Sequence, residues 1–376
     1  LSYDQFLNAA IANNCCKDII IELFKILTKN SVKLRRFNIY NRLNHHPENL
    51  DNLGYSVLPH FSECISIFSR LNYFNCSYQW PMEKTQLFNA IAEECHNIEN
   101  LKISIYYENE GIALAALIRS QKRLKKFSLI NSNNFASFPV QALMNQTHSL
   151  KSLAFEDMHC DRNLSKTKFF KYAICQLTSS AINVITQCIK INKLKFDHCE
   201  GLNSTAFFPL ATAFSNLTSL EYSYGAYKIY DRATPIILLS GLIMANCNTL
   251  KRIILDWHSR NFLDITQLVK IIAQQVISLE HLKIPIYTLE QLALIHRTHN
   301  NLRNLEIHMD RTINPYCALS LFANASLKSI EHSIKLHFDY NEISKLKFNI
   351  SNQIFESIFY KSNRVVDFVL CLQSMS

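Results

Sequence analysis

The stretch IENLKISIYYENEGIALAALIRSQKRLKKFSL, residues 98–129, holds the pattern that decides the fold. It opens and closes on the same hexad, apolar-x-x-apolar-x-apolar, first as IENLKI and then as LKKFSL. The fourth and sixth residues of a hexad alternate as they do in a short strand with two apolar side chains on one face. Between the hexads, residues 111–123 show the apolar spacing of a helix. The stretch therefore predicts a strand and a helix, followed by the next strand.

This hexad recurs along the chain, and its spacing is regular from 98 to 124 and from 124 to 150. The ten copies are LRRFNI (34–39), LNYFNC (71–76), IENLKI (98–103), LKKFSL (124–129), LKSLAF (150–155), INKLKF (191–196), LTSLEY (217–222), LKRIIL (250–255), LEHLKI (279–284) and LRNLEI (302–307), with a poorer eleventh, LKSIEH, at Leu327. Helical spacing follows at 85–97, 111–123, 207–216, 234–248, 264–276, 288–300 and 315–325. Repeated strand–helix units predict a solenoid, in which each unit buries its apolar face against its neighbours.

The repeats give the domain organisation that we expect. It is one elongated α/β solenoid of about ten degenerate repeats, with a parallel β-sheet on the concave face and helices on the convex face. A helical cap should occupy 1–30, the solenoid 31–330, and a C-terminal cap 331–376, which could be a degenerate last repeat. Longer gaps at about 40–62 and 160–180 predict insertions or unrecognised repeats.

Composition limits the function classes. The 376 residues are 48% hydrophobic and 18% charged, which excludes a disordered or collagen-like chain, and only 5 are glycine, which disfavours glycine loops that cradle phosphate. The 12 cysteines form no CxxC pair, as in proteins of a reducing compartment. The longest apolar run, 236–245, is too short to cross a bilayer and predicts a buried helix. We expect a soluble cytoplasmic or nuclear monomer, and the start at Leu1 in place of methionine indicates a fragment or a processed form.

No catalytic motif is found in the sequence. His159, Cys160, His198 and Cys199 are zinc-ligand types, but their pairs occupy different repeat positions, so we predict neither a metal nor a cofactor. The formal charge of +9 is mild. It leaves nucleic acid possible but not indicated, and the cluster KRLKK at 122–126 is best explained as the solvated end of a helix. An enzyme is therefore the least favoured class.

The hexads resemble the strand segment of leucine-rich repeats, and the repeat length resembles the cysteine-containing type found behind F-boxes. Cys199, at the ninth position of INKLKFDHC, fits the ladder residue of that type, whereas most other ninth positions do not. The phrases NCCKDIIIELFKILTKNSVKLRRFNI and ANCNTLKRIIL are similar to F-box and leucine-rich-repeat proteins predicted in arbuscular mycorrhizal fungi. The resemblance covers about residues 17–330 and includes no F-box.

The third, fifth and seventh positions of the aligned hexads should project from the concave side of the sheet, where solenoids bind partners. The candidate binding residues are Arg36, Tyr73, Lys126, Lys193, Arg252 and His281 in the third row; Lys102, Lys195, Glu221, Lys283 and Glu306 in the fifth; and Glu156, Asp197 and Asp256 in the seventh. The third row carries only positive charges and the seventh only negative ones, so we expect a face that is basic along one edge and acidic along the other. Trp80 and Trp257 are further anchor candidates, although packing between repeats is the more ordinary role.

These observations favour a non-enzymatic module that binds a protein target on the concave face. The resemblance implies the substrate-recognition part of an F-box protein in a cullin-RING ubiquitin ligase, which would engage the ligase adaptor only if an F-box precedes Leu1. A scaffold or inhibitor with no ligase role is the alternative, and a nucleic-acid binder is a third class that predicts steep salt dependence.

Overall fold

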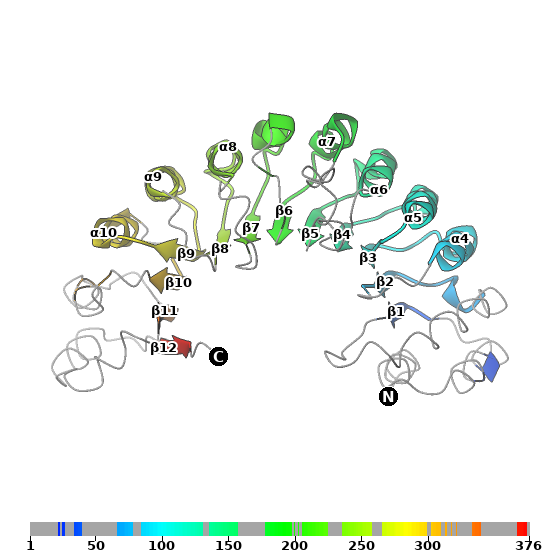
Figure 1. Cartoon of the computed structure of the whole chain (residues 1–376), viewed down its shortest axis with the longest axis horizontal. Coiled ribbons are helices and arrows are strands. Elements are labelled where there is room, and N and C mark those ends of the chain that lie inside the picture. Colours follow the sequence, from blue (N-terminus) through cyan, green and yellow to red (C-terminus); the bar gives the residue numbers. More distant parts are fainter. Residues whose placement is uncertain are drawn as a thin grey trace, which may run out of the picture. The chain divides into compact units, whose positions relative to one another are not determined.

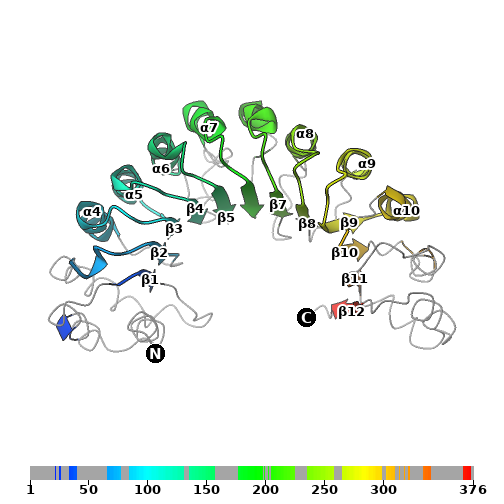
Figure 2. The same cartoon turned by 180° about the vertical axis from the view of Figure 1, so that it is seen from behind.

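The computed structural model describes residues 22, 25–26, 34–39, 66–77, 84–130, 135–156, 177–197, 199, 202, 205–224, 235–257, 265–298, 302–309, 313, 317, 321, 333–339 and 367–373. The chain divides into two compact units, Leu1–Ala213 and Phe214–Ser376. Within each unit, parallel strands form a sheet and helices lie along one side of it (Figure 1 and, from behind, Figure 2). The expected α/β fold with a parallel sheet is confirmed, and a single solenoid over 31–330 stays a prediction.

The described part of the first unit contains six parallel strands that pair in chain order. They are β1 (Arg36–Ile39), β2 (Tyr73–Cys76), β3 (Asn100–Ser104), β4 (Lys126–Ile130), β5 (Ser152–Glu156) and β6 (Lys193–Asp197). The helices that alternate with them are α4 (Thr85–Glu94), α5 (Glu108–Ser120), α6 (Ser137–Ala142) and α7 (Ser179–Thr186), with the 3₁₀ helices η3 (Leu143–Gln146) and η5 (Thr205–Thr212).

The second unit repeats this alternation of strand and helix. Its strands, also parallel and paired in chain order, are β7 (Ser219–Tyr224), β8 (Arg252–Trp257), β9 (His281–Ile286), β10 (Asn304–Met309), β11 (Ser333–Asp339) and β12 (Asp367–Gln373). Its helices are α8 (Ile236–Ala245), α9 (Thr266–Gln275) and α10 (Leu289–Thr298). Among the described helices, none combines the length and the apolar character needed to span a membrane.

Each of the ten hexads supplies a strand, and its apolar positions form the core. The first, fourth and sixth residues of every copy are at most 3% exposed, apart from Ile39, whose side chain is not described. Aromatic residues stack along this core between neighbouring strands: the ring centroids of Phe37 and Phe74 lie 5.9 Å apart, and those of Phe155 and Phe196 lie 6.0 Å apart. Complete burial of such side chains stabilises a fold by about 1.5–3 kcal/mol each.

The helices occur in the order predicted from the sequence, but two of them differ from the prediction in detail. Residues 207–216 were expected to be helical in the same way as the others, yet η5 is a 3₁₀ helix, and Pro209 inside it has no backbone N–H to donate. The apolar run at 236–245 does form α8, but only one side of it is buried. Ile237 and Met244 are 67% and 57% exposed, whereas Leu238, Leu239, Leu242 and Ile243 are buried, so the prediction of a buried helix holds for one side only.

Parallel pairing continues beyond residue 330. Ser333 in β11 pairs with Asn304, whereas the poorer copy at Leu327 would have put Ser329 in that register. In the next strand, β12, Asp367 pairs with Ser333. The segment expected to be a C-terminal cap therefore adds two strands to the repeat. Most of the cap at 1–30, the insertion at 40–62 and most of that at 160–180 lie outside the described residues.

Candidate functional site

Aligning the hexads by sequence gives the register of the strands. In the first unit the pairing runs from Arg36 to Tyr73, Asn100, Lys126, Ser152 and Lys193, which is the predicted third row. In the second unit it runs from Ser219 to Arg252, His281 and Asn304. The fifth and seventh rows follow the same register, with Glu156 beside Asp197 and Lys283 beside Glu306. We call the face that carries these three rows in each unit the open face.

The open face alternates with the core along each strand. Residues of the third and fifth rows are half-buried or exposed, except for Ser219, while the intervening fourth and sixth residues are buried. The seventh row is less uniform than expected, because Ser104, Ile130 and Pro285 are buried.

In the first unit, Glu156 is the centre of an ion-pair network on the open face. Its carboxylate lies 3.0 Å from the Lys102 ammonium and 3.9 Å from the Lys195 ammonium, and it accepts a hydrogen bond of 3.0 Å from the Ser128 hydroxyl. Lys195 also contacts Asp197 at 2.8 Å. The fifth-row lysines thereby neutralise the seventh-row carboxylates.

The second unit has a similar network around Lys283. The Lys283 ammonium lies 2.7 Å from Asp256 and 2.9 Å from Glu306, and Nε2 of His308 lies 3.4 Å from the Glu306 carboxylate. Burial disfavours the charged ammonium, but the hydrogen bonds to Asp256 and Glu306 outweigh it, so the pKa of Lys283 is raised. Arg252 pairs with Glu221 at 3.2 Å.

These pairs change the expected charge pattern of the open face. The sequence predicted a basic edge facing an acidic edge, and the rows do occupy those positions. However, each candidate carboxylate in the three rows has a cationic partner, so the acidic edge does not present uncompensated negative charge. The third row of the first unit is different, because Arg36, Lys126 and Lys193 have no ion pair with any described residue.

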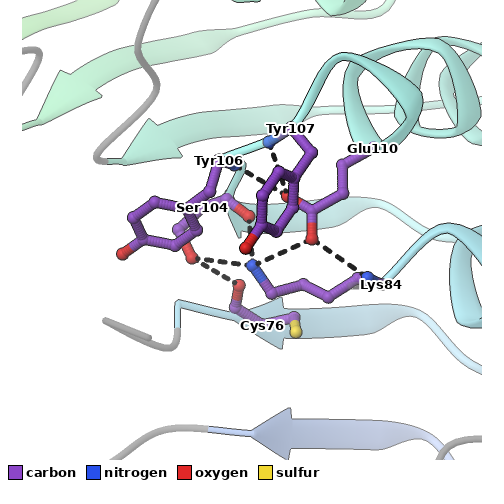
Figure 3. Close-up of polar contacts among 6 residues, drawn as sticks. All are labelled: Cys76, Lys84, Ser104, Tyr106, Tyr107 and Glu110. Carbon is purple, nitrogen blue, oxygen red and sulfur yellow. Dashed lines mark hydrogen bonds and ion pairs between the residues drawn. The ribbon is translucent and has the colours of Figure 1, made fainter. Parts of the chain in front are cut away.

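A second polar cluster, which the sequence did not predict, joins β2, β3, α4 and α5 inside the first unit (Figure 3). The Lys84 ammonium lies 2.8 Å from the Ser104 carbonyl oxygen, 3.8 Å from the Glu110 carboxylate and 4.9 Å from the centroid of the Tyr106 ring. Lys84 and Glu110 are completely buried. A buried ion pair of this kind is rare for two residue types that usually lie at the surface.

Glu110 also accepts hydrogen bonds from three backbone N–H groups, two at the start of α5 and one just before α4. Those of Lys84 and Tyr106 donate at 2.9 and 2.7 Å, and that of Tyr107 donates at 3.4 Å. The carboxylate therefore caps α5 and fixes the residue that precedes α4. Since the charged groups are buried and have partners, we interpret the cluster as a joint between repeats and not as a ligand site.

Buried amides form a further ladder at the helix C-terminal ends. Gln121 accepts a hydrogen bond of 2.9 Å from the N–H of Ile98, the first residue of the preceding hexad. Gln146 does the same for Leu124 at 3.0 Å and Asn246 for Leu217 at 2.9 Å. The resemblance to leucine-rich repeats implies a ladder at the ninth position, where Cys199 does donate to the Phe155 carbonyl oxygen at 3.3 Å. The signal that was missed is an amide three or four residues before a hexad.

The remaining candidates do not add a site. In the described part of the chain, no group of three or more potential ligands could hold a metal ion. His159, Cys160, His198 and Trp80 lie outside the described residues, and Trp257 ends β8 but its side chain is not described. Lys122 and Arg123 are exposed just after α5, as expected for a solvated helix end, but Lys126 of the same cluster begins β4, so the prediction does not hold for the whole of 122–126.

No family model matches this chain, and no curated protein matches it by sequence. The leucine-rich-repeat and F-box resemblances therefore stay predictions, and the open face is the feature from which a function can be argued.

Proposed function

We propose that this chain is a leucine-rich-repeat module without catalytic activity that binds a protein partner across its open face. The observation that carries the proposal is the register of polar side chains on successive parallel strands, with helices on the other side of each sheet. Such a face offers many adjacent side chains on a rigid support, which suits recognition of an extended protein surface.

The proposal includes a place for the module in the cell. We propose that it is the substrate-recognition part of an F-box protein in a cullin-RING ubiquitin ligase, and that its repeats form one solenoid with the open face on the concave side. The sequence resemblance supports this part. A reading frame extended upstream of Leu1 should encode an F-box, and the extended protein should co-purify with the ligase adaptor. If the extended protein contains no F-box and does not co-purify with the adaptor, the ligase role is rejected. The alternative, a scaffold or inhibitor, would then be the supported function.

Blocking the open face tests the binding half. Ala154 is half-buried in the fifth row of β5, between Ser128 and Lys195, so Ala154→Trp places a large ring over the face without removing a native polar contact. Ala116, half-buried in α5 between the exposed Ile112 and Arg119, provides the matched control Ala116→Trp. Both variants should show the circular dichroism of the native protein.

The comparison is made by quantitative affinity purification from the native cell. We expect partners recovered with the native chain to be recovered with Ala116→Trp and to be lost with Ala154→Trp. Equal recovery with Ala154→Trp would place the binding surface elsewhere and overturn the proposal.

A further inference from the structure

The third row of the first unit consists entirely of hydrogen-bond donors. Its residues, from β1 to β6, are Arg36, Tyr73, Asn100, Lys126, Ser152 and Lys193. Three of them are cations, all three are exposed, and none of the six carries a negative charge. Within the described part of the chain, none of these six side chains makes a hydrogen bond or ion pair.

The adjacent second row extends the positive charge toward the start of the strands. Arg35 and Lys151 are exposed and have no ion pair among the described residues. Lys125 lies 2.6 Å from Glu99, which is the single carboxylate of this row in the first unit. We call the second and third rows of the first unit the basic edge.

The corresponding edge of the second unit is neutralised. Lys251 and Arg303 approach the Glu280 carboxylate at 3.0 and 3.9 Å. A hydrogen bond from the Lys251 ammonium, together with its charge, lowers the pKa of Glu280. Arg252 pairs with Glu221. Among the residues that the structure describes, the excess of unpaired cations is therefore found on the first unit and not on the second.

We propose that the basic edge binds an acidic segment of the protein partner, rich in Asp and Glu and extended across the strands. This inference rests on the proposed function and names the chemistry of the partner. Neighbouring strands are about 4.8 Å apart, so Lys126 and Lys193, two strands apart, have backbones separated by about 10 Å. In an extended segment of polyproline II geometry, residues three apart lie on the same side and are about 9 Å apart. Carboxylates at that spacing can reach both lysines, with the Ser152 hydroxyl between them as a further donor.

Charge complementarity favours an acidic polypeptide over nucleic acid. The basic edge is a narrow band, and the next charged residues on the open face, Lys102 and Lys195, are already paired with Glu156 and Asp197, so the described part of this face adds no further unpaired cations for a broad polyanion. Single-stranded nucleic acid is usually held by several stacked aromatic side chains, and the basic edge has one, Tyr73. A single acidic segment needs only the row of donors.

Binding of a defined probe tests the inference. The probe is a fluorescent Glu/Asp-rich peptide of twelve residues, with a Gln/Asn peptide of equal length as reference, followed by anisotropy with the whole chain. Because screening weakens exposed charge contacts, we expect the acidic peptide to bind, to weaken as salt is added, and to bind far more tightly than its neutral counterpart. Lys126→Glu combined with Lys193→Glu should weaken binding by about tenfold or more.

The control is Lys270→Glu combined with Arg297→Glu, which makes the same change in net charge at exposed helical positions of the second unit. It should leave the affinity for the peptide within about twofold of the native value. Equal weakening by both double variants would mean that net charge alone attracts the peptide, and it would overturn the inference. Tighter binding of a single-stranded or duplex DNA oligonucleotide than of the peptide would overturn it in favour of nucleic acid.

The partner purification separates this inference from the proposed function. Loss of partners with Ala154→Trp, together with full recovery with the Lys126→Glu and Lys193→Glu variant, would reject the basic edge while keeping the open face. Recovery unchanged in both variants would reject the two together. Loss in both, with the control variants unaffected, supports both.

Discussion

The ammonium of Lys84 lies 3.8 Å from the carboxylate of Glu110, and neither side chain has any solvent exposure. The two residues belong to successive repeats and close the joint between α4 and α5 (Figure 3). A buried pair of charges contributes little net stability compared with an apolar pair, but removal of one partner leaves the other charge buried and unpaired.

Glu110→Ala should therefore be the most damaging single change in this joint. It leaves the Lys84 ammonium without its carboxylate and three backbone N–H groups without their acceptor. We expect the free energy of unfolding to fall by about 3–5 kcal/mol in urea denaturation. The exposed pair of Lys125 and Glu99 gives the control, because Glu99→Ala should cost less than about 1 kcal/mol. Similar losses in the two variants would contradict the role given to the joint.

The amide ladder predicts a smaller but specific loss. Gln146→Leu keeps most of the side-chain volume, but it leaves the buried N–H of Leu124 without its acceptor. The expected cost is about 1–3 kcal/mol, and Asn246→Leu should have a similar effect through Leu217. Gln141, exposed on α6, is the matched control, and Gln141→Leu should change stability by less than about 0.5 kcal/mol. A loss for Gln141→Leu as large as that for Gln146→Leu would argue against the ladder.

Buried thiols predict a pattern of chemical reactivity. Burial raises the pKa of Cys76 to about 11 and those of Cys95 and Cys188 to about 12, so these residues remain thiols at neutral pH. Alkylation of the native protein near pH 8, read by peptide mass spectrometry, should label the exposed Cys317 and spare these three until the protein unfolds. Native labelling of Cys188 at the rate of Cys317 would show that its site opens readily.

The same thiols predict how stability depends on pH. Their ordinary pKa is 9.0, so above that pH the unfolded chain loses these protons while the folded chain keeps them. The contribution of the buried thiols is therefore complete below pH 9.0 and is lost as the pH rises toward about 11 to 12. Replacement of Cys188 by Ala should flatten the fall of the urea midpoint with pH in this range. An unchanged slope would contradict the assignment.

Glu156→Gln separates binding from stability on the open face. The Lys102 and Glu156 side chains are 37% and 17% exposed, and partly solvated pairs contribute little, so we expect a stability change within about 1 kcal/mol. The variant releases Lys102 next to the basic edge, while Lys195 keeps its contact with Asp197. The acidic peptide should therefore bind more tightly to Glu156→Gln than to the native chain, and weaker binding would contradict the model of the basic edge.

Much of the fold follows from the hexad, because its apolar spacing constrains the strand in two ways. The alternation of the fourth and sixth residues selects the buried face, and a shift by one residue would turn polar side chains into the core. The alignment of the hexads therefore predicted the pairing of Lys126 with Ser152, and of Ser152 with Lys193. The two hexads that end in a residue other than Leu, Ile or Phe follow the same alternation, since their last residues, Cys76 and Tyr222, are both buried.

The type and burial of the helices, and the polar cluster around Lys84, were harder to predict from the sequence than the strands. A 3₁₀ helix at Thr205–Thr212 and the exposed side of α8 depend on how each segment fits the space above its strand. The Lys84 and Glu110 pair could not be predicted from the sequence, because lysine and glutamate usually lie at the protein surface. No sequence pattern links these two residues, which belong to different repeats.

The sequence by itself determined the repeat, the strand register and the identity of the three open-face rows, because these depend on local periodicity alone. Only the tertiary structure decided which of the charges remain available. Lys102 and Lys195 pair with Glu156, which lies on another strand, whereas Lys126 and Lys193 form no ion pair with any described residue. Ion pairing depends on distances of a few ångströms between residues far apart in the chain, and those distances exist only once the strands are side by side.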